Sequence, residues 1–272
     1  MSLKNTEFFI CAHKDFDCPI VSQTYKILHC GNNELNNSYD LEVISDKDNP
    51  KDNISHLNEF YSELSGFYHL WKNRELKDYV GLCHYNRYFE FMDTVPDLSQ
   101  IEQDIIVPSP FKFDVSIYEQ YKTYHNIEDL DFCINYIKEK YNVSDEKINE
   151  IFHDNDILLQ CNIFLTNKEI FNKYCEFFFD IIEAFLKHKN CVNNNMEEII
   201  QMVKDNQDKY PHGNQTEDVI KYQCRIAGFL SERLFTFFVI YNNLKVMIYP
   251  LLYEHDLPKV SYAKNGLKII NG

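Results

Sequence analysis

The stretch DYVGLCHYNRYF, residues 78–89, decides how the rest of the chain is interpreted. Its first half is a short apolar run, which is typical of a buried strand over residues 79–85. The run continues without a break into five polar and aromatic residues: His84, Tyr85, Asn86, Arg87 and Tyr88. Such an ending indicates either a ligand-binding edge of a sheet or an ordinary strand end with packed aromatic rings, and this stretch alone leaves both open.

Strand-like and helix-like segments alternate along the chain. Short apolar runs predict strands over residues 7–13, 39–45, 79–85, 104–110, 157–166 and 244–253. Apolar residues at three- and four-residue spacings predict helices over residues 55–72, 127–141, 168–187 and 217–241. Ser55 is the expected N-cap of the first of these helices. The alternation favours an α/β fold with a mostly parallel sheet that is covered on both faces.

The chain shows no internal repeat and no clear linker, so we predict a single domain over residues 1–272. A polar, Asn-rich insertion is expected near residues 189–216, with a surface loop around residues 210–215. A C-terminal tail is expected after about residue 253.

The charge balance argues against nucleic acid as a partner. The chain has 27 Lys and Arg against 42 Asp and Glu, which gives a formal net charge of −15. A protein that neutralises many phosphates needs a broad basic surface. A pocket of Arg and His could still bind a small anion, because the nearest charges dominate in a site with low-dielectric walls.

The cysteines and apolar runs predict a cytoplasmic protein. Nine cysteines without a CxxC pair, an odd number, indicate reduced thiols rather than disulfides or a zinc site. The first apolar run is too short for a secretory signal. Residues 226–249 come closest to a membrane span, but Glu232, Arg233 and Lys245 interrupt them. A buried helix followed by a strand explains that segment better.

Several segments resemble one known family. DYVGLCHYNRYF is similar to the (D)Y(I/V)GLxHYRRYF signature of the DUF4422 family, which comprises glycosyltransferase-like proteins of bacterial capsule, exopolysaccharide and O-antigen clusters. FFICAHKDFDCP resembles the first strand and loop of that family. Further similar segments run in the same order as in the family, so the resemblance extends from about residue 8 to residue 250; they are residues 51–73, 118–131, 161–182 and 222–241.

The resemblance implies a GT-A-like fold and transfer of a sugar from a nucleotide-diphosphate sugar to a growing bacterial surface glycan. It points to a UDP-sugar as donor, with UDP-galactofuranose as one candidate. The alternative is a noncatalytic carbohydrate-binding or polysaccharide-assembly protein that retains the fold. Asn86 favours this alternative, because it replaces the family's Arg and removes a charge that could contact phosphate.

The charge of a leaving diphosphate must be stabilised during transfer. Many GT-A enzymes hold a divalent metal with a D-x-D triplet at a strand end, but here the strand ends in HYN. We therefore expect His84 and Arg87, helped by Arg225 or Arg233, to face the phosphates. A requirement for Mn²⁺ or Mg²⁺ stays open, with His84 as the candidate ligand.

The other residues predicted to bind the donor lie at a strand end or at a helix start. His13 and Lys14 end the first strand. Asp52, Asn53 and Ser55 could hold the nucleoside, and helix capping explains them equally well. The full set predicted for the donor is His13, Lys14, Asp52, Asn53, Ser55, His84, Tyr85, Arg87, Arg225 and Arg233.

An acceptor hydroxyl must lose a proton, and a carboxylate can take it. Glu232 is the preferred base, because desolvation in an apolar helix could raise its pKa; an ion pair with an Arg is its ordinary alternative. Asp218 is the next candidate and could instead cap its helix, and Glu63 is a third. Acceptor binding is predicted for Tyr121, His125 and Asn162. Loop packing is the ordinary alternative for Tyr121 and His125.

The predicted partners follow from this function. They are a nucleotide sugar and a glycan acceptor, which could be lipid-linked and would then require peripheral contact with the inner face of the cytoplasmic membrane. The acidic composition gives no support for a general anionic-lipid surface, so any such docking should be local.

Overall fold

A computed structural model describes residues 5–100, 102–193, 195–211 and 216–253, and the backbone of residues 260–263 and 266–269. Residues 212–215 of the predicted loop and much of the predicted tail lie outside the described residues. In the described part of the tail, β12 (Val260–Ala263) pairs antiparallel with β13 (Gly266–Ile269).

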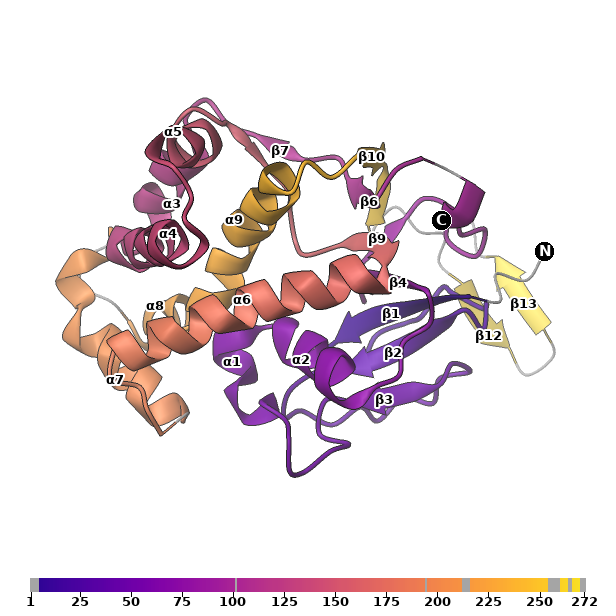
Figure 1. The fold of residues 1–272 in the computed structure, drawn as a ribbon. Helices are drawn as coiled ribbons and strands as arrows, with labels where there is room; N and C mark the ends of the chain where they lie inside the picture. Colours follow the sequence, from indigo (N-terminus) through magenta and orange to yellow (C-terminus); the bar gives the residue numbers. More distant parts are fainter. Residues whose placement is uncertain are drawn as a thin grey trace.

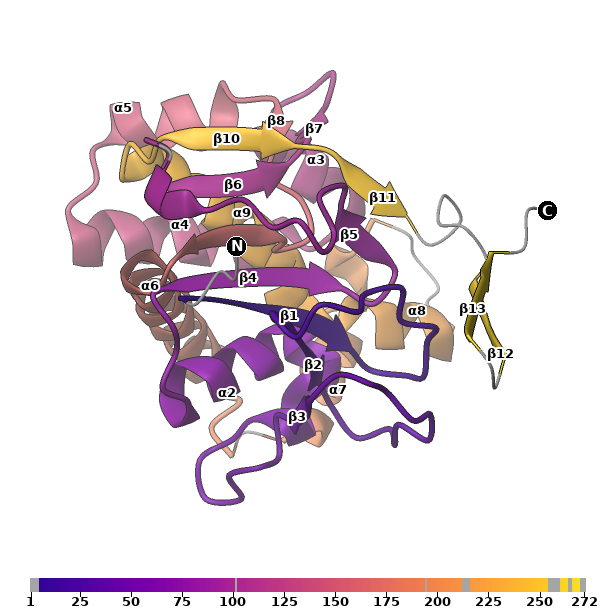
Figure 2. The ribbon, with the colours of Figure 1, turned by 90° about the vertical axis from the view of Figure 1, so that its right-hand side faces the viewer.

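The central sheet is mostly parallel, as the sequence predicts. Its strands lie in the order β10-β6-β9-β4-β1-β2-β3 (Figure 2). Every neighbouring pair on this path is parallel except the two that involve β9, which runs antiparallel to β4 and β6. The bounds are β1 (Thr6–Ala12), β2 (Tyr25–His29), β3 (Val43–Ser45), β4 (Tyr79–His84), β6 (Ile105–Pro108), β9 (Phe164–Asn167) and β10 (Val246–Tyr249).

Smaller strands extend this sheet and connect it to the helices. β5 (Arg87–Phe89) pairs antiparallel with β4 and with β11 (Leu251–Tyr253). β7 (Phe111–Lys112) and β8 (Ile157–Leu158) form a separate antiparallel pair. The short helices are η1 (Ser55–Leu57), η2 (Leu98–Gln100), the π-helix η3 (Asn149–His153) and η4 (Gln207–Lys209).

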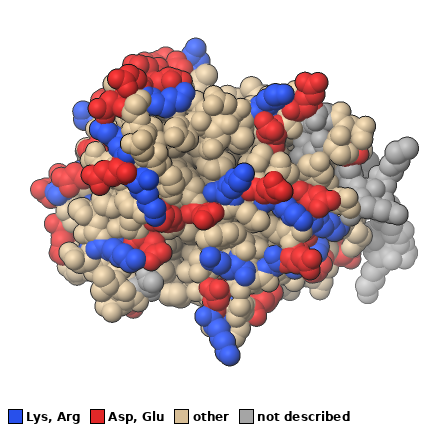
Figure 3. Space-filling view, viewed as in Figure 1, with Lys and Arg blue, Asp and Glu red and all other residues tan. Residues whose placement is uncertain are grey.

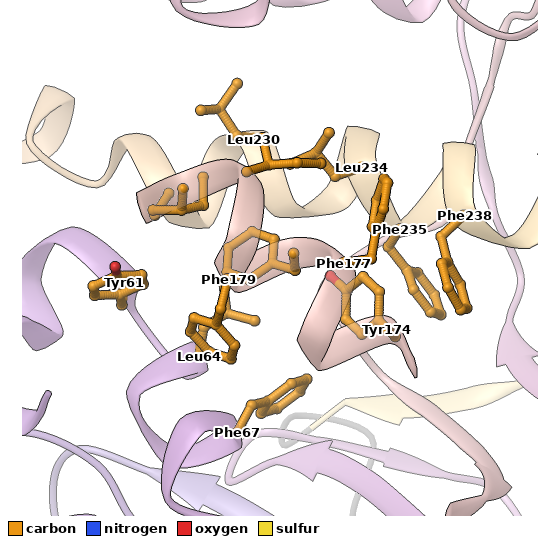
Figure 4. Close-up of a cluster of buried hydrophobic side chains, with 14 of the residues drawn as sticks. Tyr61, Leu64, Phe67, Tyr174, Phe177, Phe179, Leu230, Leu234, Phe235 and Phe238 are labelled. Atoms are coloured by element: carbon orange, nitrogen blue, oxygen red, sulfur yellow. The ribbon is translucent and has the colours of Figure 1, made fainter. Parts of the chain in front are cut away.

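The α-helices lie over one face of the sheet (Figure 1). The long helix α6 packs between α9 and α2, and its aromatic residues meet theirs in the main core (Figure 4). This core removes most of the large apolar side chains from water, which is the main favourable contribution to folding. The bounds are α1 (Asn58–Tyr61), α2 (Leu64–Asn73), α3 (Ile117–Tyr124), α4 (Ile127–Tyr141), α5 (Asp145–Ile148), α6 (Lys168–His188), α7 (Met196–Asp205), α8 (Glu217–Gln223) and α9 (Ile226–Tyr241).

The other face of the sheet is covered by loops and by β5. Its core joins Phe8 and Tyr25, whose rings stack at 4.8 Å, to Phe89 and Phe91, whose rings stack at 4.9 Å. Within the described residues no α-helix contributes to this second core. Both faces are therefore covered, as predicted, but the α-helices cover only one of them.

Four predicted elements are broken. The strand predicted over residues 244–253 breaks at Pro250, between β10 and β11. The helix predicted over residues 55–72 breaks at Ser62, whose φ is 55°. The helix predicted over residues 217–241 breaks between α8 and α9. The strand predicted over residues 157–166 breaks at Cys161 and Asn162, whose φ values are 63° and 50°. The apolar pattern continues across each break, so periodicity alone could not reveal it.

Other expectations need smaller corrections. Ser55 does not cap a helix: it lies inside η1, and its hydroxyl donates to Asn53 Oδ1 at 2.7 Å. The strand predicted over residues 39–45 shortens to β3. The sequence prediction omits β2 and α3, whose segments are short. It also omits α7, whose apolar residues at helical spacing, Met196, Ile199 and Val203, were assigned to the polar insertion. No helix in the described part of the chain is long and apolar enough to cross a membrane.

Candidate active site

A cleft of about 680 Å³ opens beyond the carboxyl ends of β1, β2 and β4. In Figure 2 the arrowheads of β1 and β4 point toward the side where α8 lies. The junctions between α1 and α2 and between α8 and α9 supply other parts of the wall. Ligands of open α/β sheets bind at this edge. Seven predicted site residues line this cleft: His13, Glu63, His84, Tyr85, Arg87, Asp218 and Arg225.

The polar end of the opening stretch forms a tight hairpin. β4 ends at His84. The turn consists of Tyr85 and Asn86, and β5 then begins at Arg87, which pairs with His84 across the two strands. Tyr88 turns inward, and its hydroxyl donates to the Tyr85 carbonyl at 2.6 Å. The hairpin thus presents four consecutive residues to the cleft and buries the fifth.

The end of β1 lies against this hairpin. The His13 and Tyr85 rings meet edge to face at 5.3 Å, and Lys14 Nζ lies 5.3 Å from the Tyr85 ring centre. Burial lowers the pKa of His13, and the charges of Lys14 and Arg225 lower it further. The imidazole of His13 therefore favours its neutral form, which can both donate and accept a hydrogen bond.

Two guanidinium groups reach the cleft from distant parts of the chain. Arg87 is half-buried, and its Nη1 lies 3.3 Å from Cys161 Sγ. Arg225 is exposed at the start of α9, and its Nε donates to Ser62 Oγ at 3.2 Å. A Cβ at Gly228 would lie 2.8 Å from the same Ser62 Oγ, so glycine allows α9 to approach this turn closely.

A half-buried carboxylate and a half-buried imidazole line the same cleft. Glu63 Oε1 accepts a hydrogen bond of 2.7 Å from Asn162 Nδ2 and lies 3.9 Å from His84 Nε2. Burial lowers the pKa of His84, and the Glu63 charge opposes that shift. His84 Nε2 is buried and has no hydrogen-bond partner in the described structure. A buried polar atom without a partner is costly, which makes Nε2 a candidate contact for a ligand.

Glu232, the preferred base, lies behind this cleft rather than in its wall. Its Oε1 accepts from the Cys161 backbone N–H at 2.7 Å, and its Oε2 lies 3.2 Å from Arg233 Nη1. Burial raises the pKa of Glu232, and the charge of Arg233 opposes that rise. Arg233 is itself buried and donates to the Phe229 carbonyl at 3.0 Å. Glu232 therefore has both the raised pKa expected of a base and the ion pair expected of its ordinary alternative.

The remaining predicted site residues lie outside the cleft wall. Asp52 accepts from the Tyr68 hydroxyl at 2.9 Å. The buried His125 ring stacks on Phe229 at 4.0 Å, and its Nδ1 lies 3.1 Å from Gln223 Oε1. The predicted residues outside the cleft wall are Lys14, Asp52, Asn53, Ser55, Tyr121, His125, Asn162, Glu232 and Arg233. The roles of all these residues stay predictions.

Some lining residues were not predicted as site residues. Asn58, Lys221 and Tyr222 join the cleft only because the α1–α2 and α8–α9 junctions meet there. No cluster of three or more His, Cys, Asp or Glu side chains that could hold a metal occurs among the described residues. His84 and Glu63 are one pair of possible ligands in the cleft, with His84 Nε2 and Glu63 Oε1 3.9 Å apart.

Comparisons with known proteins bear on the family and the fold of this chain. A family model described as a domain of unknown function (DUF4422) matches residues 7–203. A solved structure titled as the apo form of the WbbM bifunctional glycosyltransferase superimposes with a TM-score of 0.69 at 22% sequence identity. The match covers 92% of this chain and 45% of that one, so this chain spans less than half of its length. At this identity the likeness shows the fold alone. No curated protein matches the chain.

Proposed function

This chain belongs to the DUF4422 family, and we propose that it is a glycosyltransferase that transfers a sugar from a nucleotide-diphosphate sugar to a glycan. The observation that carries the proposal is the convergence of Arg87 and Arg225 on one cleft at the carboxyl ends of β1 and β4. The fold shared with a structure named as a glycosyltransferase adds support.

The cleft has the groups that such a reaction needs. When the bond to the diphosphate breaks, negative charge develops on the departing phosphates and must be stabilised. Arg87 and Arg225 can pair with phosphate oxygens, and Lys221 lies in the same wall. Glu63 and Asp218 supply carboxylates in the same cleft. Cations for the leaving group and carboxylates for the acceptor therefore occur together.

The identities of the donor and the acceptor are more specific proposals. We propose a UDP-sugar, with UDP-galactofuranose as a candidate, and a bacterial surface glycan that could be lipid-linked. The family resemblance supports both. Acidic and basic side chains lie interspersed on the helical face (Figure 3), which fits local rather than general contact with a membrane surface.

Calorimetric titration of the protein with UDP, GDP, CDP and dTDP, with and without Mn²⁺, tests the proposal. We expect selective binding of one nucleotide, weakened at least about tenfold by Arg87→Ala because a charge-assisted contact is lost. Lys112→Ala is the matched control, since Lys112 is 75% exposed and lies outside the cleft.

The outcomes separate the proposed function from its rival. Release of nucleotide from the matching nucleotide sugar would support the transferase. Binding without any turnover would favour a noncatalytic carbohydrate-binding or assembly protein. Failure of all four nucleotides to bind would contradict a diphosphate cleft.

A further inference from the structure

We propose that Glu63 is the catalytic base, which takes the proton from the acceptor hydroxyl, and that Asn162 positions its carboxylate. This inference rests on the proposed glycosyl transfer. The geometry that supports it is the placement of one carboxylate in the cleft wall, with one oxygen fixed by a buried amide and the other unoccupied.

The position and the hydrogen bonds of the candidate carboxylates distinguish them, since the Glu63 and Glu232 side chains are similarly exposed, at 15% and 22%. Both oxygens of Glu232 are held, one by the Cys161 backbone and one by Arg233, and Glu232 does not line the cleft. Asp218 lines the cleft but lies exposed in the first turn of the short helix α8. Glu63 lines the cleft and is only 15% exposed. Within the described part of the chain, no hydrogen bond occupies its Oε2.

The backbone around Glu63 holds it at the cleft. Ser62 adopts φ 55° and ψ −135°, which ends α1 and directs the chain into α2 immediately after Glu63. Asn58 Nδ2 donates to the Ser62 carbonyl at 2.7 Å and holds this turn. In a continuous helix each side chain is rotated by about 100° from the one before it, which would fix the direction of residue 63 from that of α1. The break removes this constraint. The break therefore sets the direction of Glu63.

The amide of Asn162 can have only one orientation toward Glu63. Ser231 Oγ donates to the Gly228 carbonyl at 2.6 Å, so it can only accept from Asn162 Nδ2, which lies 2.7 Å away. The second Nδ2 hydrogen then points to Glu63 Oε1 at 2.7 Å. Asn162 Oδ1 faces the Tyr174 hydroxyl at 3.3 Å. This buried network fixes the amide and leaves the second carboxylate oxygen free to accept a proton.

The imidazole beside Glu63 completes the arrangement. His84 Nε2 lies 3.9 Å from Glu63 Oε1 and is buried without a partner in the described structure. The Cys161 backbone acts on the same ring and opposes the lowering of its pKa by burial. Nε2 can therefore contact a polar group of the substrate beside the carboxylate.

The proposed step balances. The acceptor oxygen forms a bond to the anomeric carbon as the bond from that carbon to the diphosphate oxygen breaks. The electron pair of the broken bond leaves on the diphosphate, where Arg87 and Arg225 can pair with it. The acceptor's proton passes to Oε2 of Glu63. Water can replace the glycan hydroxyl, so hydrolysis of the nucleotide sugar reports the same proton transfer.

The test compares Glu63→Gln with Glu232→Gln and with wild type in hydrolysis of the nucleotide sugar whose nucleotide binds in calorimetry. We expect Glu63→Gln to lower kcat by about 10²- to 10⁴-fold, the usual contribution of a general base, while the nucleotide Kd stays within about threefold. Glu63→Asp should recover part of the loss. Glu75→Gln is the control, because Glu75 is exposed beyond the end of α2 and outside the cleft.

Turnover measured together with nucleotide binding separates a base from a merely structural residue. A base variant should lose turnover while it keeps nucleotide binding, and Glu63→Asp should restore part of that turnover. Unchanged turnover in Glu63→Gln, or loss of nucleotide binding, would each overturn the proposal. Loss of turnover in Glu232→Gln together with unchanged turnover in Glu63→Gln would assign the base to Glu232. A wild-type protein without any turnover would instead contradict the proposed function itself.

Discussion

Gly81→Ala should destabilise the sheet that carries His84 to the cleft. A Cβ at residue 81 of β4 would lie 2.1 Å, 2.2 Å and 2.4 Å from three ring atoms of Phe8 on β1. The ring cannot easily move away, because it is fully buried, stacks on Tyr25 and meets Phe89 edge to face. The glycine therefore provides the space in which the Phe8 ring lies.

The expected cost follows from two opposing effects. Overpacking of a well-packed core costs about 1–3 kcal/mol, and expulsion of the Phe8 ring would cost about 3–5 kcal/mol. Replacing glycine by alanine recovers about 0.5–1 kcal/mol of backbone entropy. The net change in the free energy of unfolding should be a loss of about 1–4 kcal/mol, or several degrees in Tm for a chain of this size.

Urea unfolding of wild type and Gly81→Ala measures this loss. Adding Phe8→Leu to Gly81→Ala should recover part of the stability, since the shorter side chain leaves room for the new methyl group. Val43→Ala on β3 is the control, because Val43 is 46% exposed and should change stability by less than about 0.5 kcal/mol. A Gly81→Ala protein as stable as wild type would refute the packing argument.

Three further predictions address the cleft and the core. Arg225→Ala should weaken nucleotide binding about tenfold in calorimetry, and the loss should shrink as salt is raised because Arg225 is exposed; equal binding would contradict a phosphate contact. Burial lowers the pKa of His84 below its usual 6.5, so its contribution to stability is fully present above about pH 6.5 and is lost as pH falls toward the lowered pKa. His84→Gln should therefore lose less stability than wild type between pH 7.5 and pH 5.5 in urea unfolding, and an equal loss would contradict this assignment. Phe179→Leu should shift the fluorescence of Trp71, the single tryptophan, because the two rings stack at 5.6 Å, and it should cost about 1 kcal/mol in urea unfolding; unchanged emission would contradict the stacking.

The fold class was predictable because it depends on long, regular patterns. Helices α4 and α6 end within one residue of their predicted bounds, since each has a continuous apolar stripe and a recognisable N-cap, Asn126 or Asn167. Strands β1 and β4 are fully or largely buried and are visible as apolar runs. The order of the strands in the sheet was not predicted, because pairing depends on contacts between segments far apart in sequence.

The site was only partly predictable. Strand ends were the right place to seek it, so His13, His84 and Arg87 were found from the sequence and line the cleft. Glu232 was preferred as the base because it lies in an apolar helix, yet the same burial gives it two fixed partners. Nothing in a periodic pattern distinguishes a buried carboxylate that faces a cleft from one that faces another helix.

The residues that direct Glu63 and Asn162 explain why pattern reasoning fails here. Ser62, Cys161 and Asn162 adopt positive φ values where the apolar period continues without a gap. For residues other than glycine such backbone costs of the order of 1–3 kcal/mol and persists only when the surroundings fix it. Those surroundings include the hydrogen bonds that Asn58 donates to the Ser62 carbonyl and that Asn162 donates to Ser231 Oγ. The interactions that offset the strained backbone are therefore the same ones that orient the proposed catalytic carboxylate.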